Sequence, residues 1–384
     1  MKYYLIAGEA SGDLHGSNLM KGILKDDADA EFRFFGGDKM NQVGGQLVRH
    51  YREMAFMGLV EVIVNFRAIM RNIRFCRNDI IEYNPDVVIL IDYPGFNLRI
   101  AEFASKAGFR VFYYISPKVW ARNESRIKKL KTYVDRLFVI FPFEIPYFKK
   151  FDLDVDFLGN PTLDAIEQKV SGVAERPEFL RKNNLSDKKI VALLAGSRKH
   201  EIKHCLPEMI KASENFPDYQ FVIAGAPSID PEYYAPFIEN TPVKIVFDQT
   251  YQLLWHAEAA IVTSGTATLE TALLDVPEVV VYKFSEITIN IARFFVHIKY
   301  FSLVNLIMDR EVVKELLQYN LSKDIAAELD KLLHDEPYRQ HMLNTFTSMK
   351  EKLGGRGASE RIANQMVLYL KEYKEANSKT ESGT

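Results

Sequence analysis

The fold is decided by a short apolar run that ends in a turn with two glycines and two acids, YYLIAGEASGD at residues 3–13. The run at 3–7 has the length and composition of a buried strand, and a helical pattern begins near Leu14. Gly8 and Gly12 would let the backbone of the turn approach a ligand closely. A strand, a glycine turn and a helix in this order predict the start of an α/β domain.

The same rhythm continues along the chain. Expected strands cover 3–7, 32–35, 87–91, 110–115 and 136–140 in the first half, and 189–194, 220–224, 243–247, 259–262 and 278–282 in the second. Helical patterns between such strands predict parallel sheets, and 384 residues exceed what one core usually supports. We therefore expect two Rossmann-like domains facing each other across a cleft, with ligands at the carboxyl ends of the strands.

A change in composition marks the expected domain boundary. The segment Asp156–Pro161 contains Gly and Pro and is followed by a polar stretch to about Lys188. We place the domains at 1–165 and 166–345, followed by a helical tail at 346–384.

Composition excludes several classes of protein. The chain carries 49 basic and 51 acidic residues, so no global charge recruits nucleic acid. Cys76 and Cys205 are the only cysteines and have no zinc-like spacing, so we expect no metal. The most apolar later segment, 136–148, is too short to span a bilayer. The apolar stretch within residues 1–9 is too short for the core of a signal peptide. A cytoplasmic protein is expected.

Two acids at strand ends are the candidate catalytic groups in the first domain. Asp92 follows the strand at 87–91 and is our candidate general base, since a sugar hydroxyl must lose its proton as it attacks. Glu9 is the second candidate, because an acid at a strand end seldom helps a core. The alternative for Asp92 is a turn or helix cap. The expected substrate contacts nearby are Gly8, Ser11, Gly12 and Asn97, although Ser11 or Asp13 could instead cap the helix.

Two turns in the second domain are suited to phosphate. After the strand at 189–194, Gly196 and Ser197 leave room for a diphosphate that Arg198 can bind, although a surface arginine is also common there. After the strand at 259–262, Ser264, Gly265 and Thr266 begin a helix whose free N–H groups suit phosphate oxygens. Glu270, about one turn later, could reach ribose hydroxyls or make a structural hydrogen bond. No Walker lysine follows this loop, and no Asp-x-Asp pair is placed to hold a metal with the diphosphate, so we expect no cofactor.

One segment, at 57–77, combines bulky apolar residues with four arginines. It is typical of a helix lying on an anionic membrane surface, although an ordinary amphipathic helix packing inward is equally compatible. The expected membrane contacts are Met57, Val60, Ile63, Val64, Phe66, Arg67, Met70, Arg71 and Arg74.

Six blocks together resemble the lipid-A-disaccharide synthase family. They are AGEASGD at 7–13, MGLVEV at 57–62, SPKVWA at 116–121, GSR at 196–198, SGTATLE at 264–270 and EVVKELLQ at 311–318. The resemblance implies a GT-B-type, inverting, metal-independent transferase that joins UDP-2,3-diacylglucosamine to 2,3-diacylglucosamine 1-phosphate. The first domain would bind the acceptor and face the membrane, and the second would bind the UDP-sugar.

The resemblance also assigns residues. Asp92 matches the family's proposed catalytic aspartate, Glu9 an acid near the acceptor, Arg198 an arginine on the diphosphate side and Asn305 an asparagine near the nucleotide, with Glu311 a further substrate contact. This chain departs from the family pattern at three places: Gly95 replaces an aspartate, Arg122 a tryptophan and Val304 a proline. Family members associate peripherally with the inner membrane and can form homodimers.

Two other functions remain open from the sequence. A UDP-sugar 2-epimerase of the same fold would use similar phosphate loops without a lipid acceptor. A non-catalytic module that binds lipid or nucleotide sugar would need the same loops but no base.

Overall fold

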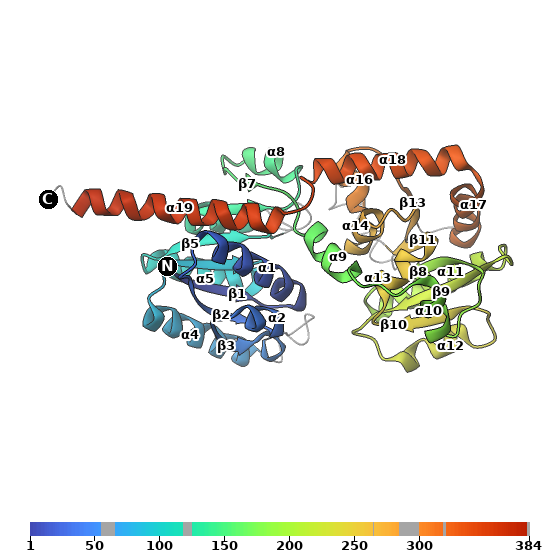
Figure 1. The fold of residues 1–384 in the computed structure, drawn as a ribbon, viewed down its shortest axis with the longest axis horizontal. Helices are drawn as coiled ribbons and strands as arrows, with labels where there is room; N and C mark the ends of the chain where they lie inside the picture. Colours follow the sequence, from blue (N-terminus) through green and yellow to red (C-terminus); the bar gives the residue numbers. More distant parts are fainter. Residues whose placement is uncertain (55–65, 118–124, 264, 284–298, 318–319, 382–384) are drawn as a thin grey trace. The chain divides into compact units, whose positions relative to one another are not determined.

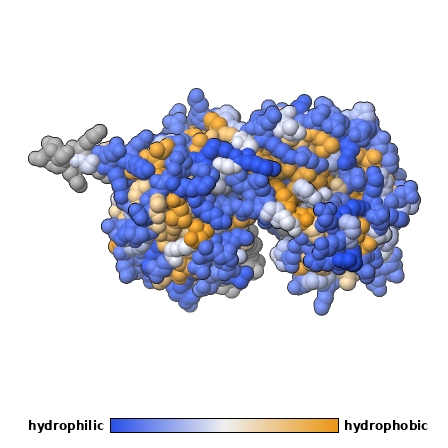
Figure 2. Space-filling view, viewed as in Figure 1, coloured by the Kyte–Doolittle hydropathy of each residue, from blue (hydrophilic) through white to orange (hydrophobic). Residues whose placement is uncertain are grey.

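The structure is a computed structural model that describes residues 1–54, 66–117, 125–263, 265–283, 299–317 and 320–381. The chain forms two compact units, Met1–Ala165 with Leu353–Thr384 (unit 1) and Ile166–Lys352 (unit 2). Within the described ranges, no helix is both long and apolar enough to cross a membrane. On the face drawn in Figure 2, hydrophobic residues reach the surface in patches on a mainly hydrophilic exterior.

Unit 1 is built on a seven-stranded parallel sheet in the order β3-β2-β1-β4-β5-β6-β7 (Figure 1). The strands are β1 (Lys2–Ala7), β2 (Glu31–Gly36), β3 (Gln46–His50), β4 (Val87–Ile91), β5 (Arg110–Tyr114), β6 (Arg136–Val139) and β7 (Asp156–Phe157). The helices are α1 (Ala10–Asp26), α2 (Asp38–Val43), α4 (Phe66–Tyr83), α5 (Pro94–Lys106), α7 (Ser125–Tyr133), α8 (Glu144–Lys149) and α19 (Ala358–Glu381), with a 3-10 turn η1 (Tyr51–Glu53). The strand order reverses between β1 and β4, where Ala7 lies opposite Ile91.

Both faces of this sheet are covered, which explains why its central strands carry apolar or aromatic residues at every position after the first. Tyr4 and Ile6 of β1 point into a core that includes Ile73 of α4 and Ile100 of α5. Tyr3, Leu5 and Ala7 point into the opposite core, which is closed by side chains of α1 and α19: Leu19, Met20, Ile23, Ile362, Ala363, Met366, Val367 and Leu370.

Unit 2 repeats the plan with six parallel strands in the order β10-β9-β8-β11-β12-β13. The strands are β8 (Lys189–Leu194), β9 (Tyr219–Gly225), β10 (Lys244–Phe247), β11 (Ala257–Thr263), β12 (Glu278–Tyr282) and β13 (Lys314–Leu317). The helices are α10 (Arg176–Lys182), α11 (Lys199–Ser213), α12 (Ala235–Ile238), α13 (Thr250–Trp255), α14 (Thr266–Leu273), α16 (Leu303–Met308), α17 (Leu321–His334) and α18 (Glu336–Lys352), with a 3-10 turn η2 (Pro231–Tyr233). Here the order reverses between β8 and β11. The two parallel Rossmann-like sheets confirm the expected fold class.

The chain passes between the units twice. α9 (Thr162–Val170) spans the division at Ala165 and Ile166. The C-terminal helices form no separate tail, because α18 belongs to unit 2 while α19 packs beside α1 in unit 1 (Figure 1). The return is fixed by Asp164, whose carboxylate accepts hydrogen bonds from the N–H groups of Gly357 (2.7 Å) and Ser359 (2.8 Å) at the start of α19.

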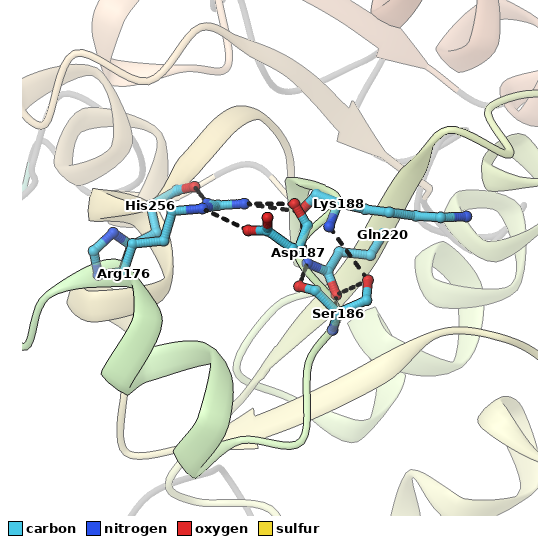
Figure 3. A network of polar contacts seen from close by, with 6 residues as sticks. All are labelled: Arg176, Ser186, Asp187, Lys188, Gln220 and His256. Atoms are coloured by element: carbon cyan, nitrogen blue, oxygen red, sulfur yellow. Dashed lines mark hydrogen bonds and ion pairs between the residues drawn. The ribbon is translucent and has the colours of Figure 1, made fainter.

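A polar network fixes the chain where it enters the sheet of unit 2 (Figure 3). Arg176 donates to the carbonyl oxygens of His256 (3.3 Å) and Lys188 (2.9 Å). The Gln220 amide donates to the carbonyl oxygens of Ser186 and Lys188, both at 2.6 Å, and accepts from the Ser186 N–H at 3.0 Å. These contacts satisfy backbone groups at the amino ends of β8 and β11, away from the strand ends where a ligand is expected.

Candidate active site

The candidate site of unit 1 lies where β1 and β4 end side by side. Gly8 follows β1, and a β-carbon at this position would lie 2.3 Å from ring carbons of Tyr93, which follows β4. The Tyr93 ring is held in place because its hydroxyl donates to the carbonyl oxygen of Met54 at 2.9 Å. Glycine is therefore required at position 8 to admit this aromatic ring.

The backbone after β4 is strained and firmly held. Asp92 and Tyr93 have φ angles of 45° and 47°, a left-handed conformation that non-glycine residues seldom adopt. The Asp92 N–H donates to the Tyr114 carbonyl oxygen at 3.0 Å, and the Asp92 carbonyl oxygen accepts from the Tyr113 hydroxyl at 2.6 Å. Such strain persists where the surroundings determine the conformation, typically at functional sites. The Asp92 side chain is half-exposed at this strand end.

Asn97 positions the backbone after β4. It is fully buried, and its Nδ2 donates to the carbonyl oxygens of Asp92 (2.8 Å) and Ile91 (3.2 Å). Its Oδ1 is buried without a hydrogen-bond partner among the described residues. The contacts of Nδ2 hold the Asp92 backbone, and the contact of Asn97 with a substrate stays a prediction.

Glu9 is placed as a functional acid would be. It precedes α1 in an extended conformation, its side chain makes no capping hydrogen bond, and it is half-exposed. Burial raises the pKa of Tyr93, and the negative charge of Glu9 raises it further, so the two side chains interact across the site. Glu9 and Asp92 thus follow the two strands between which the order of the sheet reverses.

The rest of the first turn is divided between exposure and packing. Ser11 is exposed. Gly12 is buried, and a β-carbon there would lie 3.2 Å from the β-carbon of Ala7, so this glycine permits close helix–strand packing. Asp13 is also buried and accepts from the N–H groups of Gly37 (2.8 Å) and Met40 (3.0 Å), which ties α1 to the start of α2.

In unit 2, the turn after β8 combines an exposed cation with occupied N–H groups. Gly196 has a φ of 106°. The Arg198 side chain is 80% exposed, and its guanidinium forms an ion pair with Glu201 Oε1 at 3.8 Å. Glu201 also accepts from the N–H groups of Ser197 (2.9 Å) and Arg198 (3.2 Å). No local sequence pattern predicted these contacts. A diphosphate would therefore meet the Arg198 guanidinium rather than these two N–H groups.

The turn after β11 leaves the start of α14 open. Ser264 lies outside the described residues. Gly265 has a φ of 150°, and both it and Thr266 are exposed. Apart from its chain neighbours, no atom of the described residues lies within 4 Å of the position that its β-carbon would occupy. The first N–H groups of α14 are therefore accessible to a ligand. Glu270 is half-buried one turn later, and its Oε1 accepts from the Tyr251 hydroxyl at 2.8 Å.

Asn305 and Glu311 precede β13. Asn305 is fully buried; its Nδ2 donates to the Val313 carbonyl oxygen (2.9 Å) and to Glu315 (2.8 Å), and its Oδ1 accepts from two backbone N–H groups. These contacts fix the loop before β13. Glu311 is exposed and pairs with Lys314 at 3.0 Å. The contacts of both residues with a nucleotide or substrate stay predictions.

The expected membrane helix is described from Phe66 onward. Met57, Val60, Ile63 and Val64 lie outside the described residues, and of Phe66 only the backbone, as the first residue of α4, is described. One face of α4 packs inward, as the alternative had it, while Arg67, Met70, Arg71 and Arg74 all lie on its exposed face.

The fold defines a class of protein. A UDP-GlcNAc 2-epimerase from Neisseria meningitidis, solved with UDP-GlcNAc bound, has a TM-score of 0.64 at 14% identity and matches 96% of this chain and 100% of its own. CalG4, the calicheamicin glycosyltransferase, has a TM-score of 0.59 at 15% identity, with 97% and 98% covered. At such identities the likeness shows the fold alone, a GT-B-type fold that glycosyltransferases and epimerases share.

Sequence relatives define the family within this class. The profile of the family described as lipid-A-disaccharide synthetase matches residues 3–366. Proteins named lipid-A-disaccharide synthase are 36% identical over 377 residues in Trichlorobacter lovleyi (96% of this chain, 97% of the relative) and 38% identical over 377 residues in Syntrophus aciditrophicus (96% and 97%). The chain belongs to the lipid-A-disaccharide synthetase family, which confirms the resemblance seen in the sequence.

Proposed function

We propose that the chain transfers the diacylglucosamine unit of UDP-2,3-diacylglucosamine to the 6-hydroxyl of 2,3-diacylglucosamine 1-phosphate. The hydroxyl oxygen forms a bond to the anomeric carbon of the donor while the bond from that carbon to the diphosphate breaks. The products are a β-1,6-linked disaccharide 1-phosphate and UDP. The proton of the hydroxyl passes to a carboxylate.

The strained strand end at Asp92 carries this proposal. A carboxylate held there by its own backbone contacts can accept a proton without rearrangement, which suits a general base. Glu9, after the neighbouring strand, would bind the acceptor sugar. Exposed Ser11 and the backbone at Gly8 would complete the acceptor contacts.

The donor would be held by unit 2. The exposed guanidinium of Arg198 and the accessible N–H groups at Gly265 and Thr266 can stabilise the negative charge that develops on the departing UDP. Positive groups of this kind supply the stabilisation that a metal ion gives in other transferases.

The reaction is tested with purified protein, both acylated substrates, and mass spectrometry of the products with UDP release measured in parallel. Disaccharide phosphate formed with and without a chelator supports the proposal. UDP release without disaccharide favours an epimerase or hydrolase, and the absence of both products favours a binding module.

The base is tested with Asp92→Asn, which keeps the size of the side chain but cannot accept the proton. Turnover should fall by about two to four orders of magnitude with little change in melting temperature. Asp152→Asn, at an exposed aspartate of unit 1 that also has a positive φ of 51°, is the control. Near-normal turnover of Asp92→Asn would instead point to Glu9.

We also propose that unit 1 contacts an anionic membrane surface through α4. Its outward face adds Met70, Phe75 and Ile81, with exposed fractions of 41%, 40% and 56%, to the row of arginines. Exposed apolar side chains beside cations suit the interface of an anionic bilayer, where the acylated substrates reside.

Vesicle flotation tests the membrane contact. The protein should float with vesicles that contain anionic phospholipid and not with neutral ones. Replacing Arg67, Arg71 and Arg74 by Gln should abolish flotation, whereas replacing Lys182, Lys189 and Lys211 of unit 2 removes the same charge and should not. Equal flotation of the two triple variants would contradict the proposal.

A further inference from the structure

Three residues from separate helices of unit 2 form a hydrogen-bonded chain that ends at Glu270. Lys169, near the end of α9, donates from Nζ to the hydroxyl oxygen of Tyr251 at 3.0 Å, and its ammonium group lies 4.1 Å from the centre of the same ring. Tyr251, in the first turn of α13, donates in turn to Oε1 of Glu270 at 2.8 Å. The direction of donation is therefore Lys169 to Tyr251 to Glu270.

The contacts of this chain offset part of the cost of burying the carboxylate. Burial is the largest effect and leaves the pKa of Glu270 raised, while the hydrogen bond from Tyr251 and the positive charge of Lys169 both act to lower it. Burial and the charge of Glu270 raise the pKa of Tyr251, so the phenol stays protonated and remains the donor. A neutral donor backed by a cation therefore favours the charged form of Glu270 against the effect of burial.

The contact occupies one carboxylate oxygen and leaves the other. Among the residues that the structure describes, none donates to Oε2 of Glu270. The hydrogen bond to Oε1 restricts the rotation of the carboxylate, and Glu270 lies about one turn along α14 from the first N–H groups of the helix. A single carboxylate oxygen has two lone pairs, which suit the adjacent 2′- and 3′-hydroxyl groups of a ribose.

We propose that Tyr251 is a positioning residue that, backed by Lys169, holds Glu270 to bind the ribose diol of the nucleotide and so makes the protein prefer ribonucleotides to 2′-deoxyribonucleotides. The proposal rests on the function proposed above, in that a UDP group lies at the start of α14. It adds residues of α13 and α9 that act through Glu270 and set the preference for a nucleotide with ribose over one with 2′-deoxyribose.

A merely structural role for Tyr251 predicts something different. If the hydroxyl only joined α13 to α14, its loss would lower the melting temperature and weaken UDP and 2′-deoxy-UDP equally. A positioning role predicts a change in the ratio of the two dissociation constants, because only the ribonucleotide uses the oriented carboxylate fully.

The test measures binding of UDP and 2′-deoxy-UDP by isothermal titration calorimetry on the full-length protein. Tyr251→Phe should weaken UDP by about tenfold, the effect of one hydrogen bond to a charged group, and 2′-deoxy-UDP by less than about threefold. Lys169→Met should shift the ratio in the same direction by a smaller factor, and Glu270→Gln should reduce the preference for ribose.

Unit 2 offers a matched control. Tyr338 donates to Glu328, and Lys331 both donates to Glu328 at 3.2 Å and lies 5.7 Å from the Tyr338 ring. Tyr338→Phe therefore removes the same kind of hydrogen bond on α18 and should leave both nucleotide affinities unchanged.

The outcomes separate this inference from the proposed function. If wild-type protein binds UDP and Tyr251→Phe keeps the wild-type ratio of affinities, or weakens both nucleotides equally, the positioning role is overturned while the proposed function stands. If wild-type protein binds no UDP, the proposed function fails and this inference fails with it.

Discussion

Glu278 is the residue whose replacement should most increase stability. It begins β12 opposite Ala260, a core residue of unit 2, and it is fully buried. Neither of its carboxylate oxygens has a hydrogen-bond partner within the described part of the chain. Burial raises the pKa of Glu278 well above its ordinary value of 4.5. The side chain is therefore a neutral acid in the folded protein.

The sign of the pH effect follows from this shift. Between pH 4.5 and the folded-state pKa, the unfolded chain releases a proton that the folded protein keeps, so folding becomes less favourable as the pH rises. Each unit by which the pKa is raised costs about 1.4 kcal/mol of stability above the folded-state pKa. Below pH 4.5 the side chain keeps its proton in both the folded and the unfolded state, so this loss of stability is absent.

Two substitutions separate the titration from the unpaired oxygens. Glu278→Gln removes the proton release and should flatten the loss of stability between about pH 5 and pH 8. Glu278→Leu also removes the unpaired polar atoms and should raise the free energy of unfolding by about 1–3 kcal/mol more. Urea unfolding followed by circular dichroism at both pH values gives these differences.

The comparison can refute the reasoning directly. If Glu278→Leu is no more stable than wild type at pH 8, or if Glu278→Gln loses as much stability with rising pH as wild type does, then the carboxylate has a partner that compensates its burial. A control at an exposed acid, Glu311→Gln, should leave the pH profile unchanged, since Glu311 lies on the surface in an ion pair.

Three further substitutions test features of the site and the fold. Arg198→Ala should lower kcat/KM for the UDP-sugar in steady-state assays by roughly 10- to 100-fold, because a charge-assisted hydrogen bond is lost. Lys211→Ala, in the helix α11 that follows Arg198, should leave kcat/KM unchanged. Gly8→Ala should destabilise the protein by about 1–3 kcal/mol, because the added β-carbon displaces the Tyr93 ring. Gly95→Ala, where the added β-carbon meets no atom of the described residues within 4 Å, should not destabilise it. Thermal unfolding measures both effects. Asp164→Ala should lower the melting temperature through loss of about 1 kcal/mol of capping at α19, and Asp164→Asn should retain part of it.

The strands of both sheets were largely predictable because their central members are apolar along their whole length. Three edge strands were not predicted, because they lack such an apolar run. β3 and β13 carry polar or charged residues, QLVRH and KELL, and β7 has only two residues. An edge strand is covered less fully than a central one and is stabilised by pairing on one side, so its sequence has no continuous apolar run.

Within the site, the sequence located the strand ends but not the partners of the side chains there. Asp92 and Glu9 were placed by their position after apolar runs. The enclosure of Asn97 and Asn305 depends on backbone groups brought from other segments, which no local pattern records. The same holds for Tyr251, whose contact with Glu270 joins residues 19 positions apart.

The order in which the ribosome makes this chain has a consequence for its folding. One core of unit 1 is closed by Ile362, Met366, Val367 and other residues of α19, which are synthesised after all of unit 2. Unit 2 is continuous in sequence and can complete its core first. An apolar face of the sheet in unit 1 therefore stays uncovered until α19 has been synthesised, and a chain that lacks α19 would keep a permanent chaperone-binding surface.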